Sequence, residues 1–358
     1  MKIKDEIRAN ATEPVPRIFK KCLSEIAVDI ETASAIPPFQ QIKTELYKVF
    51  CSEEDLEKLC QSDSIHMDGT FKIVPKLFSQ LYTIHGSYLR KIFPLAFCLI
   101  GSKSKETYIE LFSAIKEHAR SHGLIFHPKF VMMDFETACI AALEEVFKGV
   151  VVKGCFFHFS QCIWKQVQRL GLVTEYAGNK EVRNFFRKMA ALALVPPTLV
   201  PEAFLIIQEN QPSTGEEDTF ISYMAETWLD EQDAKFPISI WNHFDTNGAR
   251  TNNVVEGWHS SLNNKASIRH LDLFSMIKLL QEEEAANQAV VFQLDGGQEK
   301  IQRVKTSSFT SDKDYTMSQS NVSAETNLKL ERNGFNQFIC MAIEVGINID
   351  LIHFEKFK

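Results

Sequence analysis

The sequence of 358 residues predicts a mixed α/β fold that contains an all-α insertion. Short β-favouring runs alternate with helical patterns in the first half of the chain, and a continuous helical region follows them. We expect strands at residues 65–74, 80–86, 92–101, 129–134 and 150–157. We expect helices at residues 105–122, 136–147 and 159–170. Strands and helices that alternate in this order favour a mixed sheet with flanking helices.

The all-α insertion is expected after this alternating region. Residues 179–232 follow a helical pattern that is broken by prolines, which end or kink helices. A linker with Pro, Gly and Asn at 237–253 precedes two further helices, at 254–264 and 271–287. The predicted organisation is a helical lead-in (1–60), the first part of the α/β core (61–170), the insertion (171–248), the last part of the core (249–290), and a polar linker with a C-terminal tail (291–358).

The composition is that of a folded protein. Hydrophobic residues make up 45% and charged residues 24%, which excludes mostly disordered and low-complexity classes. No apolar run approaches the roughly 20 residues of a membrane helix, and the first residues lack the apolar region of a secretory signal. We therefore expect an intracellular protein with no membrane partner, whose eight cysteines are mostly free thiols.

Charge is unevenly distributed along the chain. With 39 basic and 46 acidic side chains the net charge is −7, so any surface that binds nucleic acid must be local. Residues 148–188 contain eight basic and two acidic side chains, whereas residues 189–234 contain nine acidic side chains and no Lys or Arg. Two solvated helix faces would explain this pattern. The alternative is a stretch that faces phosphates, followed by one that is turned away from DNA.

Three acidic residues stand where a site could form, and each also has a structural explanation. Asp68 precedes a glycine, and Asp-Gly is a strong hairpin-turn signal. Asp134 lies where a strand gives way to a helix, as an ordinary N-cap would. Glu256 follows Asn253 by three residues, which is the spacing of a capping box. Taken singly, each acid is better explained by structure than by catalysis.

Taken together, the three acids predict a metal site. Asp68 and Asp134 are expected at the ends of adjacent strands, where sites in open α/β sheets gather, and Glu256 on a late helix. Converging carboxylates repel one another unless a cation neutralises them, and Mg²⁺ prefers oxygen ligands. Two such ions can stabilise the attacking and leaving oxygens of a phosphoryl displacement. The pattern therefore points to phosphodiester chemistry.

Five runs of the sequence resemble the catalytic region of the Mutator-like element (MULE) transposases. In chain order they are DGTFKIVP, FSQLYTIHG, VMMDFETA, GCFFHFSQCIWKQVQRLGL and RTNNVVEGWHSSLN. The resemblance extends over residues 65–264 and, weakly, over residues 14–60. As a set, in this order and at this spacing, the runs are far more specific than any single acid.

The resemblance implies both a fold and an activity. The fold would be ribonuclease H-like, with an α-helical insertion before the last catalytic helix. Asp68, Asp134 and Glu256 would be the catalytic Asp-Asp-Glu triad and would bind two Mg²⁺ or Mn²⁺ ions. The activity would be hydrolysis at the ends of a DNA element followed by strand transfer into target DNA. The partners would be double-stranded DNA and further copies of the chain, and the location would be the nucleus.

Further residues were considered for auxiliary roles. Cys155 and His158 match the CxxH pattern of the family, and a helix start of this kind favours a phosphate. Cys162 follows on the same helix face, but no fourth ligand for a structural zinc site is apparent, and Cys155 could simply be a small buried residue. Lys165 and Arg169 are expected to contact the DNA backbone. His259, on the polar helix face of Glu256, is expected to bind DNA or to assist catalysis.

Two other functions stay open. The chain could be a transposase-derived regulatory protein that binds DNA or protein without catalysis, because no Cys/His zinc module precedes Asp68 in this sequence and the net charge is acidic. It could also be a nuclease of the same fold that acts on RNA or on RNA–DNA hybrids. An intact triad argues against the regulatory protein, whereas a comparison of strand transfer with simple hydrolysis on one duplex would decide between the transposase and the nuclease.

Overall fold

The computed structural model describes residue 17 and residues 47–295, apart from residues 90, 231, 247 and 267. The chain divides into two compact units. Among the described residues, the first unit comprises residue 17 and residues 47–152 and 252–295, and the second comprises residues 153–251. The first unit is therefore built from two segments that are distant in sequence.

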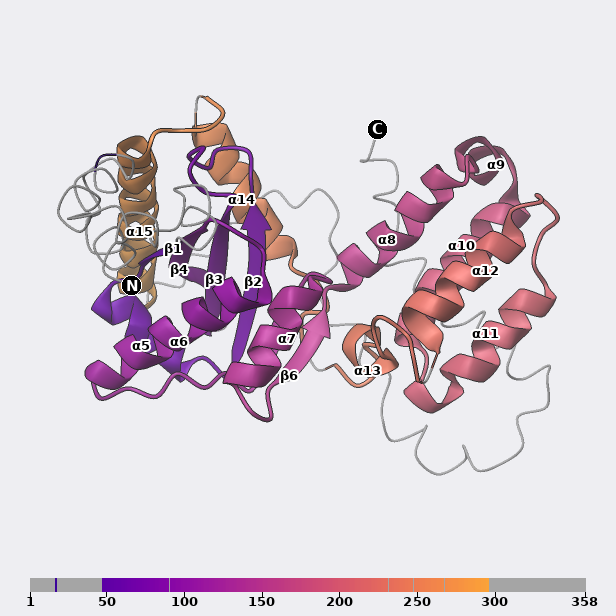
Figure 1. Cartoon of the computed structure of the whole chain (residues 1–358), viewed down its shortest axis with the longest axis horizontal. Coiled ribbons are helices and arrows are strands. Elements are labelled where there is room, and N and C mark those ends of the chain that lie inside the picture. Colours follow the sequence, from indigo (N-terminus) through magenta and orange to yellow (C-terminus); the bar gives the residue numbers. More distant parts are fainter. Residues whose placement is uncertain are drawn as a thin grey trace, which may run out of the picture. The chain divides into compact units, whose positions relative to one another are not determined.

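A six-stranded sheet runs through the first unit (Figure 1). Its strand order is β1-β4-β3-β2-β5-β6. The pairs β1–β4, β4–β3 and β3–β2 are antiparallel, whereas β5 is parallel to β2. The predicted mixed α/β class is confirmed. The strands are β1 (Tyr47–Phe50), β2 (Ser64–Thr70), β3 (Gln80–Tyr88), β4 (Lys91–Ile100), β5 (Phe130–Met133) and β6 (Val151–Gly154).

Helices cover both faces of the sheet, which explains why its central strands are apolar over most of their length. Successive side chains of a strand point to opposite faces. On β3, Tyr82 packs edge-on against Tyr108 of α6, with ring centroids 5.3 Å apart. Its neighbour Leu81 lies in a core cluster with Leu262 of α14 and Leu280 of α15.

The Tyr82 face is covered by α5 (Glu53–Gln61), α6 (Lys105–Ser121) and α7 (Thr137–Val146). The first two helices begin where their sequences predict. The side chain of Ser52 accepts a hydrogen bond from the Asp55 N–H at 3.3 Å, and that of Ser104 accepts one from the Thr107 N–H at 3.2 Å. These serine caps satisfy backbone donors that the first turn of a helix leaves unpaired.

The Leu81 face is covered by α14 (Asn253–Lys265) and α15 (Leu273–Asp295), which pack on β2 and β4 respectively. The loop after β2 also turns over this face, because Ile73, Val74 and Phe78 join the same apolar cluster. The sheet therefore lies between two helical layers, and the second layer comes from the late segment of the chain.

The described part of the second unit is helical after β6. Its core is aromatic: the Phe159 ring stacks on Trp241 at 4.9 Å and meets Trp228 edge-on at the same distance. The elements are α8 (Phe156–Arg169), α9 (Val173–Gly178), α10 (Lys180–Ala191), two 3₁₀ turns (Leu192–Leu194 and Pro197–Leu199), α11 (Val200–Glu209), α12 (Glu217–Met224), a π turn (Ala225–Leu229) and α13 (Ile238–Trp241).

The structure differs from the predicted elements in four places. Tyr47–Phe50 is a strand within the predicted helical lead-in, and the rest of residues 1–46, apart from residue 17, lies outside the described residues. β2 ends at Thr70 rather than at residue 74, and β6 ends at Gly154, so that α8 starts earlier than expected. The predicted linker contains α13. The predicted tail lies outside the described residues beyond residue 295.

Among the described helices, none combines the length and the apolar character that a membrane crossing requires.

Candidate active site

Asp68 stands in the middle of the sheet rather than in a turn. It lies inside β2 and is directly opposite Thr83 of β3, so its explanation as a hairpin-turn residue is wrong. On the other side, β2 and β5 pair in parallel with His66 opposite Met132. Asp68 lies two residues beyond this pair within β2, and Asp134 lies two residues beyond it, just after the end of β5. The two strands are neighbours, about 4.8 Å apart. The register thus brings two of the predicted acids together.

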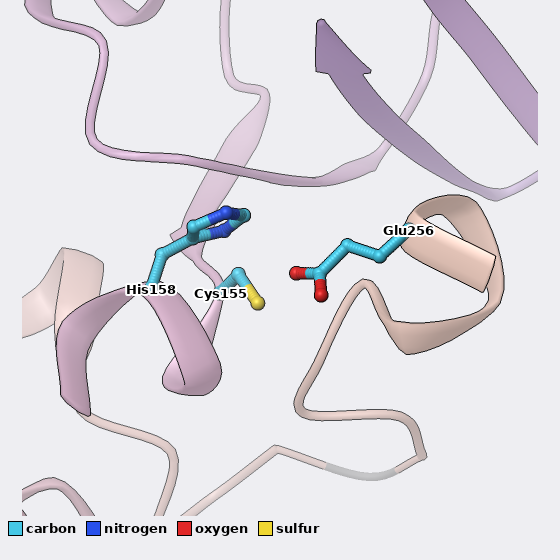
Figure 2. Close-up of side chains that lie close together, drawn as sticks. All are labelled: Cys155, His158 and Glu256. Carbon is cyan, nitrogen blue, oxygen red and sulfur yellow. The ribbon is translucent and has the colours of Figure 1, made fainter. Parts of the chain in front are cut away.

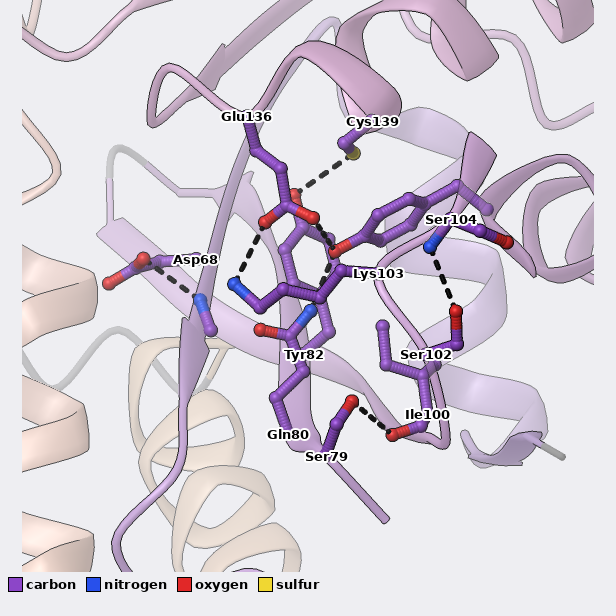
Figure 3. A network of polar contacts seen from close by, with 12 residues as sticks. Asp68, Ser79, Gln80, Tyr82, Ile100, Ser102, Lys103, Ser104, Glu136 and Cys139 are labelled. Atoms are coloured by element: carbon purple, nitrogen blue, oxygen red, sulfur yellow. Dashed lines mark hydrogen bonds and ion pairs between the residues drawn. The ribbon is translucent and has the colours of Figure 1, made fainter. Parts of the chain in front are cut away.

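The carboxylate of Asp68 is held by two donors. Its Oδ1 accepts the backbone N–H of Gly69 at 2.8 Å, as Figure 3 shows. Its Oδ2 lies 3.3 Å from Nδ1 of His259, which comes from α14. Asp68 is only 8% exposed and His259 only 5%. The pair is therefore shielded from water, and the electrostatic interaction between its two side chains is stronger than that of a similar pair on the surface.

Asp134 follows β5 directly and is not the N-cap of α7, because that position belongs to Glu136. Burial, and then the negative charges of Asp68 and Glu136, raise the pKa of Asp134 to about 7, while Lys103 acts in the opposite direction. Within the described residues, Oδ1 of Asp134 is buried and has no hydrogen-bond partner. A buried carboxylate oxygen without a donor is costly, and a cation would satisfy it.

A polar network lies beside Asp134 (Figure 3). Glu136 accepts hydrogen bonds from Lys103 Nζ at 3.2 Å and from the Tyr108 hydroxyl at 2.7 Å. The Tyr108 hydroxyl in turn accepts one from Gln80 Nε2 at 2.6 Å. Both carboxylate oxygens of Glu136 are thus paired, which distinguishes this acid from Asp134. The network brings a positive charge, Lys103, close to Asp134.

Glu256 is in the first turn of α14 (Figure 2). The capping box with Asn253 is wrong: the N-cap is Asn252, and its side chain makes no capping hydrogen bond. The Asn252 amide instead donates to the Met67 carbonyl at 2.9 Å, and its Oδ1 lies 3.0 Å from His66 Nδ1. The helix start is therefore attached to β2 next to Asp68.

Three side chains on one stripe of α14 contact β2. Asn252 contacts Met67, His259 contacts Asp68, and the Asn263 amide donates to the Thr70 hydroxyl at 3.3 Å. Residues at i, i+4, i+7 and i+11 lie on one face of a helix, so Glu256 belongs to the same stripe, between Asn252 and His259. Helix and strand thus run in the same direction. This register places Glu256 on the helix face that covers the Asp68 strand.

The three carboxylates do not all gather at one point. In the part of the chain that the structure describes, Asp68, Asp134 and Glu256 do not form a group whose ligand atoms all lie within 4.8 Å of one another. The geometry therefore pairs the two aspartates and leaves Glu256 on the adjoining helix of the same unit.

The other predicted site residues lie in the second unit. Cys155 is buried and is the N-cap of α8, and His158 is in the first turn of that helix (Figure 2). The Phe156 N–H donates to the Arg250 carbonyl at 2.9 Å, so one of the donors at this helix start is already used. Lys165 and Arg169 are exposed and lie one turn apart on α8. Their side chains are accessible to a phosphate backbone.

Sequence analysis did not identify several residues that surround the aspartates. These are His66, Thr83, Lys103, Glu136 and Asn252. Two of them carried a signal: His66 precedes Asp68 by two residues and so shares its face of β2, and Asn252 precedes the last predicted helix. Thr83 and Lys103 come close to the acids only through the fold.

Comparisons with known proteins support the resemblance. Among curated proteins no match is found. Residues 64–162 match the family model of the MULE transposase domain. The matched region contains Asp68, Asp134, Cys155 and His158 but ends before Glu256 and His259. This match agrees with the resemblance of the sequence runs, and it identifies residues 64–162 as a MULE transposase domain.

Proposed function

We propose that the chain is a DNA transposase of the Asp-Asp-Glu type, which hydrolyses phosphodiester bonds at the ends of an element and joins the freed ends to target DNA. The observation that carries this proposal is the parallel pairing of β2 and β5 up to His66 opposite Met132, since Asp68 and Asp134 each follow this pair by two residues. The buried, unpaired Oδ1 of Asp134 fits a cation between them better than it fits a structural role. The match to the MULE transposase domain supplies the substrate class.

We further propose that the sheet is ribonuclease H-like. Support comes from the antiparallel series β4-β3-β2, to which β5 is added in parallel after a helix. The helices α9 to α13, which lie within residues 171–248, would then be the insertion that the resemblance implies. The last catalytic helix would be α14.

Asp68, Asp134 and Glu256 would hold the metal ions. When bound, Mg²⁺ or Mn²⁺ would neutralise the carboxylates and polarise the scissile phosphate. In the first step the oxygen of water forms a bond to phosphorus while the P–O3′ bond breaks, and the proton that water loses ends on the released 3′ oxygen. In the second step that 3′-OH attacks a target phosphodiester and releases a 3′-OH of the target strand. The role of the chain is to bind and orient the two strands in this order.

Lys165 and Arg169 would bind the DNA backbone, because their charges are exposed and lie in the most basic segment of the chain. Cys155 and His158 would act as auxiliary residues at the start of α8. The chain would act as a homo-oligomer that pairs two element ends, and it would be located in the nucleus. Both proposals follow from the family resemblance alone.

The test is cleavage of a labelled duplex that carries the element ends. We expect Asp68→Asn and Glu256→Gln to lower the Mg²⁺-dependent cleavage rate by at least about 10³-fold, because each removes a charged ligand. The controls are Asp63→Asn and Glu282→Gln, which make the same chemical changes at exposed positions of the same unit. Thermal unfolding should show that all four variants remain folded. Mg²⁺-dependent cleavage that persists in either site variant would contradict the assignment.

A non-catalytic, DNA- or protein-binding regulator is the second candidate. It is favoured by one observation, that the three carboxylates are not gathered within 4.8 Å of one another among the described residues. Calorimetric titration with Mn²⁺ separates the candidates. A working acid cluster should bind the ion and lose that binding in Asp68→Asn, whereas a vestigial cluster should give no heat of binding in either protein.

A further inference from the structure

We infer that His259 is a positioning residue for Asp68: its Nδ1–H orients the carboxylate, and Thr83, the cross-strand partner of Asp68, fixes the nitrogen that carries the proton. The inference deepens the proposed function and rests on it, since Asp68 is there taken as a metal ligand. His259 itself touches neither DNA nor ion in this account. Its expected role as a DNA contact is replaced by one inside the site.

The geometry places His259 over one cross-strand pair. Asp68 and Thr83 are directly opposite each other in the β2–β3 ladder. From α14, His259 reaches both of them, with Nδ1 at 3.3 Å from Asp68 Oδ2 and Nε2 at 2.9 Å from Thr83 Oγ1. All three residues are buried. A buried imidazole between two side chains has little freedom to rotate, so its two contacts are kept together.

Counting protons assigns the direction of each bond. A carboxylate oxygen only accepts, so Nδ1 of His259 must carry a hydrogen. In neutral imidazole Nε2 is then an acceptor. The Thr83 hydroxyl has one hydrogen and two possible acceptors, His259 Nε2 at 2.9 Å and the Asp68 carbonyl at 3.3 Å, and we assign the hydrogen to the nearer one, Nε2. Thr83 Oγ1 also lies 3.0 Å from His85 Nε2, which can donate to the lone pair that remains on the hydroxyl oxygen. The chain His85, Thr83, His259, Asp68 is therefore consistent with one hydrogen in each contact.

The consequence is a carboxylate fixed in its plane. The Gly69 N–H donates to Oδ1 and His259 Nδ1 lies against Oδ2, so rotation of the Asp68 side chain would break either the Gly69 hydrogen bond or the contact with His259. The lone pairs of the Asp68 oxygens that do not face Gly69 or His259 therefore point in a fixed direction. Outer partners that orient a metal ligand in this way typically contribute about 10- to 100-fold in metal affinity.

A purely structural role for His259 is the competing explanation, because the same hydrogen bonds also tie α14 to the sheet. Two amide variants separate the explanations. In His259→Asn the side-chain amide lies near the place of Nδ1 and can still donate to Asp68. In His259→Gln the amide lies near the place of Nε2, reaches Thr83 and leaves Asp68 without its donor. If His259 only ties α14 to the sheet, the two variants should lose Mn²⁺ affinity to a similar extent.

The experiment is a calorimetric titration of the full chain with Mn²⁺, with thermal unfolding measured without metal. We expect His259→Asn to bind Mn²⁺ within about 3-fold of the wild type, and His259→Gln to bind it about 10- to 100-fold more weakly. His122→Asn, at an exposed position, is the control and should change neither quantity. Equal affinities in the two variants, or affinities that follow the unfolding temperatures, would overturn the inference.

A second readout needs no metal, and its first part uses the wild-type protein alone. The ¹⁵N shifts of the His259 imidazole in the wild-type protein should show a protonated Nδ1 and an unprotonated Nε2. In Thr83→Val, which removes the hydroxyl and keeps the shape, we expect the Nε2–H form to appear. A wild-type ring protonated at Nε2 alone would overturn the inference and leave the proposed function standing. Absence of Mn²⁺ binding by the wild type would overturn both.

Discussion

His243 is a buried histidine that the second unit keeps neutral. Its Nε2 donates to the Gly154 carbonyl at 2.8 Å, and its Nδ1 lies 3.2 Å from the Thr246 hydroxyl. Burial lowers the pKa of His243 to about 4, although the Gly154 hydrogen bond acts in the opposite direction. The residue therefore joins the end of β6 to the loop after α13 only in its uncharged form.

This depressed pKa predicts a loss of stability in mild acid. The unfolded chain binds a proton at His243 near pH 6.5, and the folded chain binds it only near pH 4. The contribution of His243 is thus fully present above pH 6.5 and is lost as the pH falls towards 4. At pH 5 the loss should be on the order of 2 kcal/mol in the free energy of unfolding, measured by urea denaturation at pH 7.5 and 5.

The comparison protein for this prediction is His243→Gln. Its side-chain amide can still donate to Gly154 but does not titrate. Burial also lowers the pKa values of His66 and His85, so both proteins should lose stability in acid, and only the difference between them reports on His243. If the free energy of unfolding changed equally with pH in the wild type and in His243→Gln, the assigned pKa of His243 would be excluded.

At the site, sequence reasoning located the acids but not their surroundings. Asp68 and Asp134 could be found because each follows apolar, β-favouring residues in one continuous run of sequence. The contact of His259 with Asp68 joins residues separated by 191 positions, 68 and 259, and no local pattern encodes it. For the same reason the local explanations of Asp68 and Glu256 were wrong: a dipeptide signal is overruled when the residue pairs within a sheet or faces a strand.

Among the elements, those that form from local pattern were predicted well and those that need a distant partner were not. The helix predicted at 105–122 matches α6 closely, because Ser104 caps it and its apolar positions repeat with helical spacing. Strand β1 was missed because it has only four residues, which become a strand by pairing with β4, from Tyr47 opposite Ile100 to Phe50 opposite Phe97. Helix α13 is likewise too short for a periodic signal.

Glycine in α14 makes a prediction at the level of one helix. Gly257 is exposed in the helix interior, and a Cβ added there would meet nothing within 4 Å. Since glycine disfavours a helix relative to alanine, Gly257→Ala should raise the free energy of unfolding by about 0.5 to 1 kcal/mol in a urea titration.

The matched variant in a strand should have the opposite effect. A Cβ at Gly86 of β3 would collide with Ser62 Oγ and would lie 2.6 Å from Leu95 Cδ1. Gly86→Ala should therefore lower the free energy of unfolding by about 1 to 3 kcal/mol. If both alanine variants shifted stability in the same direction, the described backbone environments would be wrong.

At the scale of the whole molecule, a net charge of −7 opposes binding to DNA, so affinity must come from a local patch. We expect the double variant Lys165→Gln, Arg169→Gln to weaken duplex binding. Two lost phosphate contacts should reduce the slope of log K against log salt concentration by about 1.8. Fluorescence anisotropy with a labelled duplex at several salt concentrations measures both quantities.

The control for this prediction has the same net charge. Arg120→Gln with Lys129→Gln also removes two exposed positive charges, but from the first unit. If the double substitution on α8 acts locally, this control should keep the affinity and the salt slope of the wild type. Equal weakening of the two proteins would mean that overall charge, rather than α8, governs binding.

The split first unit determines the order in which a newly made chain can mature. Strands β1 to β5 leave the ribosome early, yet the apolar surface formed by Leu81, Phe97 and Leu99 is covered only when α14 and α15 are synthesised. Residues 153–251 are complete before that moment. The helices of the second unit can therefore fold first. Until α14 and α15 are synthesised, one apolar face of the sheet is exposed to solvent, and chaperones recognise such a state. A premature stop just after residue 251 would leave the chain permanently in that state.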